Sequence, residues 1–589
     1  MKRLSLAFLA AVLCGIALHA AAPSGKLPVM VIETQNHQAI DSKENYVSAT
    51  YYIDSKGLEG VESIGSAQEP LPLKIKGRGN YTWAAFNKKP YRLKLDKKAA
   101  LLGMESSKHF ALLAHADDNR AFMRNLTGFE VSRMAGLPWT PADQPCEVIL
   151  NGDYIGLYFL TETIRMDKKR VNLSNPDDAV EDWLAANPGK TSADYPFTDE
   201  DYTGPWLVEI DNTIDECQVE VPSRQQEAAT LYVTHKSPED YVTDAHRNWL
   251  IKEIDEIDRL IYADDNAKGA WLDKIDLTDA ARFFVVNQIM NNYESYHGSC
   301  YLSKDKGASE KWHFGPVWDF GSAFQESRDQ SKWIWDSQYV QHWIGNMWNC
   351  EAFRNEVKRI FTKMDKEGFK RLYDYQNAYA ARIAEAAKCD AERWQNDGYG
   401  NADMQTPLES VQKQLAESIQ SFGYKLGVEG YTLPVTEPST DIYLRGKMTN
   451  WDAPENTKFT KIGEGMYQLK LEVLSDVFKL AGPEWGVGNV DYGYNGEAFE
   501  LDKTYSLVNA GANMMMKDGE VKDVTLLFDW STKTLTVSHT SAIDLLPAEE
   551  VSNEAPEYFN LQGMPVAHPE RGVLYIIRQG SKVAKSLAR

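Results

Sequence analysis

The chain has 589 residues, a formal net charge of −22 at pH 7, 43% hydrophobic residues and 25% charged residues. This length is enough for roughly three or four domains, and the composition is that of a globular protein. The acidic balance argues against a non-specific nucleic-acid binder, because a phosphate backbone is bound by Lys and Arg side chains.

The N-terminal residues have the pattern of a secretion signal. A basic start at Met1–Arg3 is followed by an apolar stretch over 4–17 and by small residues that end at Ala22. This pattern predicts a signal peptide over residues 1–22 and therefore a secreted or cell-envelope protein. Attachment to the outer surface is one form that this localisation can take. No other stretch approaches 18 apolar residues, so we expect no transmembrane span in the remaining chain.

Strands and helices alternate irregularly over the next four hundred residues. Residues 27–35 predict a first strand, two further strands flank a Gly-rich turn, and residues 119–135 predict a helix. Residues 146–160 predict a hairpin whose turn, Asn151-Gly152, suits the positive φ angles of a type I′ turn. Residues 175–204 have the composition of a surface insertion, residues 246–263 and 279–292 have helical periodicity, and residues 351–425 are mostly helical.

The composition changes at a polar, Pro-containing segment, which predicts a linker over residues 435–440. Short alternating strands follow over 441–540, with the spacing of a small β-sandwich. Residues 550–589 predict a separate, short β segment. The boundaries that we predict are therefore 1–22, 27–434, 435–440, 441–540 and 550–589.

Two motifs suggest phosphoryl-transfer chemistry. The first is Asp319-Phe320-Gly321, because protein kinases hold Mg²⁺ with the Asp of such a tripeptide. We expect Asp319 to be buried among aromatic residues, where a carboxylate without a cation would be costly, and the alternative is a turn or N-cap Asp. The second motif is the turn Gly77-Arg78-Gly79-Asn80, for which an ordinary hairpin turn is the alternative.

The order of these and further motifs resembles the spore-coat CotH family of atypical protein kinases. The resemblance rests on the Gly-rich turn, on Lys88-Lys89-Pro90-Tyr91-Arg92-Leu93-Lys94-Leu95, on Leu112 to Asp118, on Met123-Arg124-Asn125, on the hairpin with Thr161-Glu162 after it, and on the Asp-Phe-Gly tripeptide, and it covers about residues 70 to 325.

This resemblance implies a reduced kinase-like fold that holds a nucleotide, ATP with Mg²⁺ or Mn²⁺, between two lobes. It makes Lys89 the candidate phosphate-anchoring lysine, assisted by Arg78, and places Glu162 among the cofactor-binding residues. A solvated strand face is the alternative for the cations. An internal ion pair is the alternative for Arg124 and Glu162.

The segment that corresponds to the kinase catalytic loop departs from the kinase pattern. Glu294 stands in the place of the catalytic Asp, and Ser299, five residues later, stands in the place of the metal-binding Asn. Glu is a usable base but is one methylene longer, and Ser is a weaker Mg²⁺ ligand than Asn. His297 is an alternative base or a packed structural histidine.

The C-terminal part resembles two kinds of accessory module. Residues 441–540 are similar to starch-binding β-sandwiches, in which exposed aromatic rings stack on sugars. The candidate platforms are Trp451, Trp485, Tyr492 and Tyr494, with core packing as the alternative. The ending from Tyr558 resembles the C-terminal sorting domains of secreted proteins of the Bacteroidetes type.

We therefore expect an α+β protein with an atypical, two-lobed kinase-like core and helical additions, followed by a small β-sandwich and a short β tail. The leading hypothesis is an ATP/Mg²⁺-binding kinase that acts on Ser/Thr residues of an envelope or secreted protein, or on another hydroxyl acceptor. The alternatives are a catalytically degenerate envelope scaffold and a surface protein that binds polysaccharide.

Overall fold

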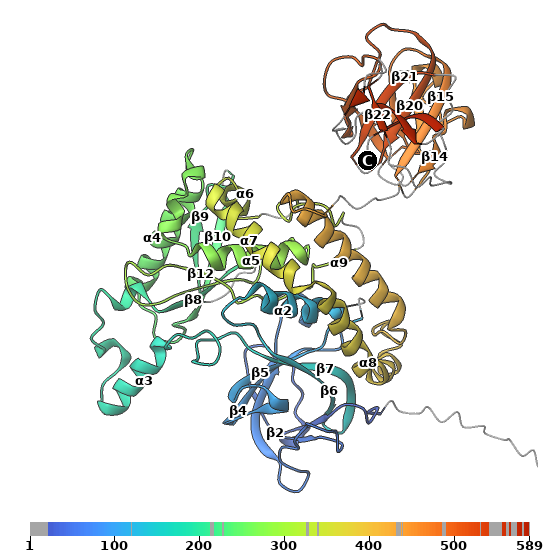
Figure 1. The fold of residues 1–589 in the computed structure, drawn as a ribbon. Helices are drawn as coiled ribbons and strands as arrows, with labels where there is room; N and C mark the ends of the chain where they lie inside the picture. Colours follow the sequence, from blue (N-terminus) through green and yellow to red (C-terminus); the bar gives the residue numbers. More distant parts are fainter. Residues whose placement is uncertain are drawn as a thin grey trace, which may run out of the picture. The chain divides into compact units, whose positions relative to one another are not determined.

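The computed structural model describes residues 22–540, with short gaps at 119–120, 213–216, 227–228, 326–328, 338–340, 432–437, 439, 464, 486–489 and 531, and also residues 557–560, 565–566, 574–579 and 582–587. Nearly all of the predicted signal peptide and most of the predicted linker 435–440 lie outside these residues. The chain divides into two compact units, Met1–Thr432 and Leu433–Arg589, and each is described by itself. The fold is mixed α+β (Figure 1).

The first unit begins with a closed seven-stranded barrel in the order β1-β2-β3-β4-β5-β7-β6. Its strands are β1 (Val29–Thr34), β2 (Val47–Asp54), β3 (Leu71–Gly77), β4 (Tyr91–Ala99), β5 (Ser107–Leu113), β6 (Asp143–Leu150) and β7 (Asp153–Glu162). The parallel pairing of β1 with β6 closes the barrel, and the other pairings are antiparallel. Apolar side chains on alternate positions fill the interior, as the two-residue period of a strand requires.

The hairpin of β6 and β7 confirms the predicted turn. Asn151 has φ 52° and Gly152 has φ 79°, and the flanking residues Leu150 and Asp153 are paired. Positive φ at both central positions is the signature of a type I′ turn.

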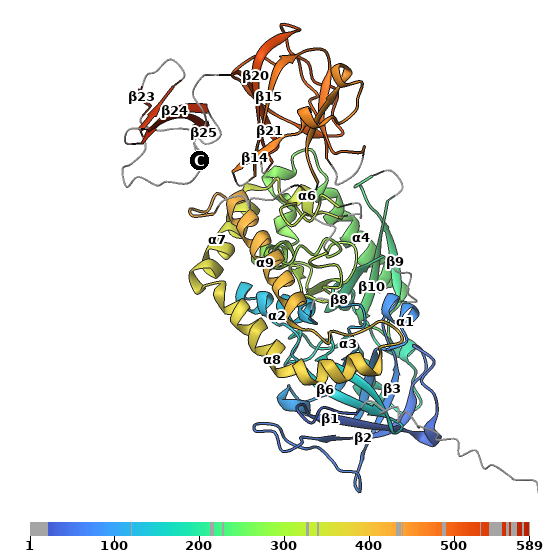
Figure 2. The same cartoon turned by 90° about the vertical axis from the view of Figure 1, so that its right-hand side faces the viewer.

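Helices and a second sheet build the rest of the first unit. The antiparallel sheet has the order β12-β11-β8-β10-β9. Its strands are β8 (Trp206–Asp211), β9 (Gln218–Pro222), β10 (Thr230–Ser237), β11 (Cys300–Lys304) and β12 (His313–Phe314). Figure 2 shows α8 (Lys370–Arg393) and α9 (Gln405–Lys425) alongside each other, next to α7 (Glu351–Glu367). The other helices of this unit are α1 (Tyr81–Ala85), α3 (Pro176–Ala186), α4 (Asp244–Ile261) and α6 (Ile344–Met347).

Two helices lie in the centre of the main core. Helix α2 (Met123–Ala135) and helix α5 (Leu277–Ile289) are buried on almost every side and pack on each other. The sequence predicts that the first of them begins at Asn119, but it begins at Met123. Ala121 and Phe122 have φ of 56° and 59°, and such left-handed residues do not belong to a right-handed helix. Ala121 and Phe122 therefore form a turn just before α2.

The second unit contains two antiparallel sheets around one core. The sheet β13-β16-β17-β19 and the sheet β14-β15-β20-β21-β18 both contribute apolar side chains to it. The strands are β13 (Tyr443–Gly446), β14 (Thr460–Gly463), β15 (Met466–Leu474), β16 (Phe478–Ala481), β17 (Asp491–Gly493), β18 (Thr504–Ser506), β19 (Val508–Asn509), β20 (Val521–Asp529) and β21 (Thr534–His539).

A further antiparallel sheet of four strands stands at the C-terminal end, in the order β23-β22-β24-β25. Its strands are β22 (Glu557–Phe559), β23 (Pro565–Val566), β24 (Leu574–Gln579) and β25 (Lys582–Leu587). In the described part of the whole chain, no helix combines the length and the apolar character that a membrane span needs.

Candidate active site

The Asp319-Phe320-Gly321 loop is held against α2. The backbone N–H of Phe320 donates to Oδ1 of Asn125 at 2.8 Å, and the guanidinium of Arg124 donates to the carbonyl of Gly321. The Phe320 ring is fully buried and lies against Gly128, where a Cβ atom would stand 2.3 Å from the ring. Real Cβ atoms do not approach so closely, so this seat for the ring requires glycine.

The other side of this loop is held by the end of α5. Asn292, which is 1% exposed, donates its side-chain N–H to the carbonyl of Asp319 at 3.1 Å and to Oδ1 of Asn287 at 3.2 Å. Among the described residues its Oδ1 has no hydrogen-bond partner. A buried acceptor without a donor is unfavourable, which makes this oxygen a natural ligand for a cation.

Asp319 is exposed, which corrects the expectation that it is buried. Its neighbours Phe320 and Phe324 are buried instead, and Asp319 adopts φ 54° with Oδ1 accepting from the N–H of Gly321 at 3.0 Å. The cost of a buried charge therefore gives no argument for a metal here. Instead, the Asp319 carboxylate faces solvent from a turn whose backbone is hydrogen-bonded to α2 and to Asn292, just after α5.

Further acidic side chains converge on Asp319. Burial raises the pKa of Asp117, and together with the neighbouring charges of Asp118 and Asp319 it brings the pKa to about 6, against the opposing charge of Arg124. A Cβ atom placed on Gly321 would lie 3.1 Å from Oδ1 of Asp319 and 3.7 Å from Oδ2 of Asp117, so both carboxylates face the same small volume.

Glu294 belongs to the same group of acids. Burial raises its pKa, a hydrogen bond from the hydroxyl of Ser322 opposes that rise, and the charge of Asp319 adds to it. The structure therefore brings together the two residues predicted to be catalytic, Glu294 and Asp319. It adds Asp117, Asn292 and Ser322, which the sequence reasoning did not assign.

Arg78 is a second cation near this acidic group, besides Arg124, and is coupled to Asp319. The Gly-rich turn leads from β3 into the short helix α1, and Gly79 has φ 78° there. The Arg78 guanidinium lies 5.5 Å from the ring centroid of Trp318, the residue before Asp319. Burial lowers the pKa of Arg78, and Asp319 is the first of the negative charges that oppose this effect. The Gly-rich turn and the Asp-Phe-Gly loop are thus coupled electrostatically through Arg78 and Asp319, which form no direct ion pair.

Three other predicted residues have contacts outside this group. The Lys89 ammonium donates a hydrogen bond to the carbonyl oxygen of Trp83 at 2.5 Å, within the segment that follows the Gly-rich turn. Glu162 faces Arg170 at 3.8 Å and accepts the N–H of Ala142. Ser299 precedes β11 with φ 51°, and no contact given for the described residues joins it to Asp319.

The expected alternative of an Arg124–Glu162 ion pair is not formed. Arg124 faces Asp118 at 3.6 Å, and Glu162 faces Arg170. The buried lysine of this region is Lys88, which is 2.8 Å from Oδ1 of Asp390 on α8, with both side chains 1% exposed. Lys88 and Lys89 are adjacent in the sequence, and the motif alone does not indicate which of the two is buried.

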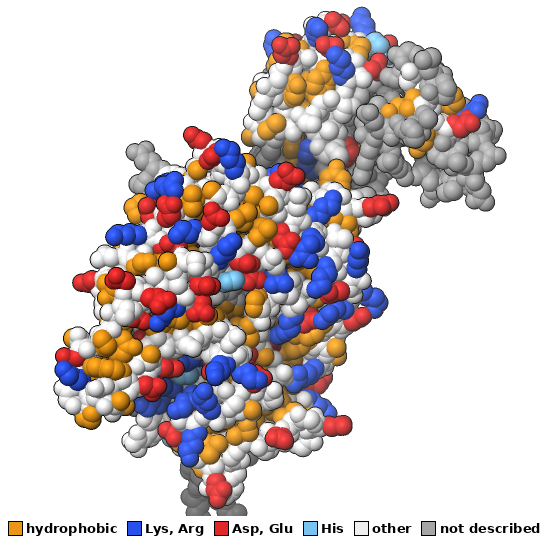
Figure 3. All heavy atoms as spheres, turned by 60° about the vertical axis from the view of Figure 1, so that its left-hand side comes forward, with side chains coloured by type: hydrophobic (Ala, Val, Ile, Leu, Met, Phe, Trp, Pro, Cys, Tyr) orange, Lys and Arg blue, Asp and Glu red, His pale blue; other side chains and the backbone are white. Residues whose placement is uncertain are grey.

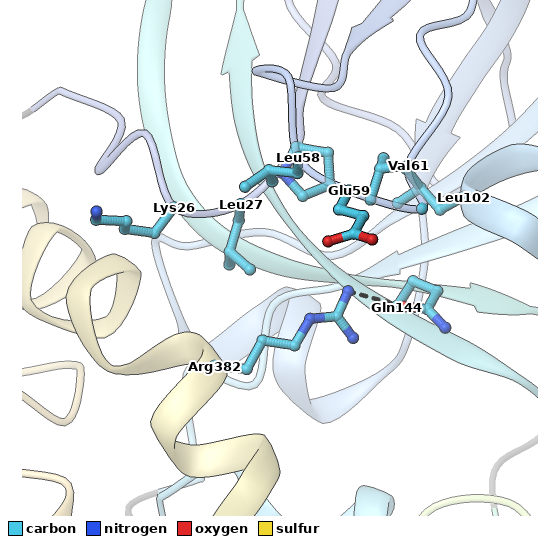
Figure 4. A pocket seen from close by; sticks show the side chains of 10 residues that line it. Lys26, Leu27, Leu58, Glu59, Val61, Leu102, Gln144 and Arg382 are labelled. Carbon is cyan, nitrogen blue, oxygen red and sulfur yellow. Dashed lines mark hydrogen bonds between the residues drawn. The ribbon is translucent and has the colours of Figure 1, made fainter.

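Two other features lie apart from the acidic group. Within the described residues, Asp276, Asp279 and His313 have the spacing of a metal site, but Asp276 caps α5 and Asp279 binds Arg282 and His313, so these ligands are already used. A pocket of about 410 Å³ opens on the barrel (Figure 4). It is lined by residues that precede β1, by the β2–β3 loop, and by Leu102, Gln144 and Arg382; none of them belongs to the group around Asp319.

The aromatic residues of the second unit divide into two sets. Trp485 is 46% exposed, and its ring centroid is 6.0 Å from that of Trp451. Tyr492 is buried against Phe528 and Trp530, and Tyr494 packs against Phe499 and Tyr505. Of the four predicted platforms, Trp485 is therefore exposed, Trp451 and Tyr494 are partly buried, and Tyr492 is buried.

The geometry is that of a site in which a cation from one part of the fold faces clustered carboxylates from another part, as enzymes that act on phosphates require. The family model described as CotH kinase protein matches residues 75–421, which is more than half of the chain. The chain therefore belongs to the CotH kinase family. None of the curated proteins compared with the chain matches it significantly.

Proposed function

We propose that the first unit binds ATP with a divalent cation and transfers the γ-phosphoryl group to a hydroxyl acceptor, with a Ser/Thr protein as the leading class. Membership of the CotH kinase family suggests an atypical kinase. The observation that carries the proposal is the convergence of Asp319, Glu294 and Asp117 opposite Arg78. In this proposal the barrel is one lobe, and the second sheet with α2 and α5 is the other.

The donor atoms of the site suit Mg²⁺ or Mn²⁺, because these cations prefer oxygen ligands. Asp319, Asp117 and the unpartnered Oδ1 of Asn292 would hold the ion. When bound, the ion neutralises charge on the transferring phosphoryl group. The predicted metal ligand Ser299 stays in the proposal only as a ligand through water, because no described contact joins it to Asp319.

The chain's own residues would divide the remaining work. Arg78 binds phosphate oxygens. Glu294, whose pKa burial raises, accepts the proton of the acceptor hydroxyl as its oxygen bonds to the γ-phosphorus and the bond to the leaving ADP breaks. Ser322 fixes the Glu294 carboxylate by its hydrogen bond. Lys89 and Glu162 remain predicted cofactor-binding residues, and each must leave its present partner to take that role.

The test is thermal unfolding of the full chain with ATP and Mg²⁺. A ligand present at 100 times its Kd adds about 2.7 kcal/mol of stability. We expect this gain in the wild type, its loss in Asp319→Ala, and no change in Asp329→Ala, which removes an exposed carboxylate ten residues downstream. An equal Mg²⁺-dependent gain in both variants would refute the metal assignment. Nucleotide binding without phosphate transfer would favour the catalytically degenerate scaffold.

For the second unit we propose carbohydrate binding through Trp451 and Trp485. The favouring observation is the exposed Trp485 ring beside Trp451, with the Arg445 guanidinium 4.2 Å from the Trp485 ring centroid. Tyr492 is buried, so it takes no part in the surface that we propose. We expect Trp485→Ala to abolish retention of the full chain on an insoluble α-glucan, whereas Val508→Ala, at another exposed apolar side chain, should not.

We also retain the proposal that the protein is exported to the cell envelope or beyond. It rests on the N-terminal sequence pattern and on the resemblance of the C-terminal segment to sorting domains. A fusion of residues 1–30 to a reporter that is active only after export tests the first of these features.

A further inference from the structure

Three neighbouring cations at or near barrel strands have no acidic partner within ion-pair distance among the described residues. They are Lys76 on β3, Arg92 on β4 and Arg165 after β7, and we name them the cationic patch. All three are partly buried. Among the described residues, none of them has a carboxylate within ion-pair distance, and Nε of Arg92 is buried without a hydrogen-bond partner. Figure 3 shows Lys and Arg side chains gathered in the lower part of the first unit, at its barrel end.

The pairing of the strands makes this arrangement unfavourable in the absence of a ligand. Lys76 and Arg92 stand directly opposite each other in the β3–β4 register, and like charges at such positions destabilise a sheet. Burial lowers the pKa of Lys76 and of Arg165, and in both cases the charge of Arg92 lowers it further. The Lys76 ammonium lies 4.9 Å from the ring centroid of Tyr46.

The acidic groups of this region act on the patch only from a distance. Glu239 raises the pKa of Lys76 and of Arg165, Glu44 acts on Lys76, and Asp167 and Asp178 act on Arg165. Other partly buried or buried cations of the same unit have direct partners, such as Lys236 with Glu209 at 2.8 Å and Arg170 with Glu162 at 3.8 Å. Lys76, Arg92 and Arg165 differ from these two cations in lacking such a partner among the described residues.

The cationic patch is electrostatically coupled to Arg78 of the candidate active site. Arg78 follows the last residue of β3 and is two positions from Lys76. Arg92 is also among the charges that lower the pKa of Arg78, and Arg78 is coupled to Asp319. An anion on the patch would thus lie next to the group that faces the acidic cluster.

We propose that the cationic patch is a phosphate-binding subsite. Two guanidinium groups and an ammonium match the tetrahedral oxygens of a phosphate and neutralise its charge. The phosphate comes either from the nucleotide of the proposed function or from a phosphorylated acceptor. The subsite itself does not depend on phosphoryl transfer. Only the source of its ligand rests on the proposed function.

The experiment measures inorganic phosphate and pyrophosphate binding to the full chain by titration calorimetry at low ionic strength. We expect Arg92→Gln and Arg165→Gln each to weaken pyrophosphate binding by about tenfold or more, because charge-assisted hydrogen bonds are the strong ones. Lys74→Gln and Lys94→Gln are the matched controls. These two residues form the nearest cross-strand pair on the same face of these strands but are exposed, and their variants should bind as the wild type does.

A second readout separates a ligand site from a structural role. Without phosphate, Arg92→Gln should unfold at a higher temperature than the wild type, because it removes a like-charge pair, and added phosphate should stabilise it less. Equal loss of binding in Arg92→Gln and Lys94→Gln would overturn the proposal, since the effect would then be one of general charge. Unchanged binding in both patch variants would overturn it as well.

Two further titrations identify the source of the phosphate. Weaker ATP binding in Arg92→Gln, with AMP binding unchanged, assigns the subsite to the phosphate chain of the nucleotide. Unchanged ATP binding with lost inorganic phosphate binding assigns it to a phosphorylated acceptor. A wild type that binds pyrophosphate at the patch but shows no response to ATP with Mg²⁺ would refute the proposed function and leave the subsite intact.

Discussion

Asp390→Asn is expected to destabilise the first unit strongly, although it changes a single atom. Oδ1 of Asp390 lies 2.8 Å from the ammonium of Lys88 and accepts the N–H of Leu157 at 2.9 Å. Asn keeps an acceptor for that N–H but leaves the buried ammonium without a counter-charge. Breaking a buried ion pair from one side costs about 3–5 kcal/mol. We expect a loss of that size in the free energy of unfolding.

The sign of the pH dependence follows from Lys88. Burial lowers its pKa, and Asp390 opposes this effect. In the variant the folded state holds fewer protons on this lysine than the unfolded state, so stability should rise with pH and part of the deficit should disappear by about pH 10. Denaturant unfolding of the full chain at pH 7 and at high pH measures this, and hydrogen exchange of α8 and β7 locates it.

The matched control is Glu385→Gln on the same helix. Its pair with Lys388 is more than half exposed and should contribute little to stability, because solvent screens the attraction. The double variant Lys88→Met with Asp390→Asn removes both charges and should recover most of the stability, because an apolar replacement of a buried pair is often neutral. A loss in Asp390→Asn no larger than that in Glu385→Gln would refute the reasoning.

Three further outcomes are expected. Burial raises the pKa of Asp143 to about 6, so its ionised form is unfavourable in the folded state. From pH 4 to pH 7 the free energy of unfolding of the wild type, measured in urea, should fall by up to about 3 kcal/mol relative to that of Asp143→Asn. Parallel plots of unfolding free energy against pH for the two proteins would contradict this. Gly128→Ala should displace the Phe320 ring and abolish the Mg²⁺ response, whereas an intact response would show that the loop does not need this seat. The double variant Glu294→Asp with Ser299→Asn should raise any phosphate transfer from ATP, and a loss of transfer would show that this loop is organised differently from the kinase pattern.

Local signals in the sequence were enough for much of the fold. The hairpin at Asn151-Gly152 was predicted because Asn and Gly tolerate the two positive φ angles of a type I′ turn. Both residues have positive φ in the structure. The start of α2 was misplaced by four residues because the left-handed turn at Ala121 and Phe122 has no composition signal in this sequence. The closure of the barrel by β1 and β6 joins strands more than a hundred residues apart, and no local pattern records such a pairing.

The candidate site was predictable as a set of motifs but not as a geometry. The motifs predicted Arg78, Glu294 and Asp319 as site residues, and this assignment stays a prediction; the structure shows that the charge of Asp319 acts on both of the others. The contribution of Asn292 depends on one hydrogen bond to the Asp319 carbonyl, which is a tertiary contact. The exposure of Asp319 was not predicted, because its aromatic neighbours in the sequence turn inward while the backbone turn points the carboxylate outward.

The closed barrel and the protected second sheet restrict how an acceptor protein can be recognised. Closure leaves the barrel without an edge strand, so no peptide can extend it by backbone hydrogen bonds. The second sheet ends in β12, which has two residues, and in β9, which carries the exposed Glu220 and ends at Pro222. Short edges, charges and proline all oppose strand addition. If the first unit captures an acceptor, recognition must therefore proceed through side chains and not through an added strand.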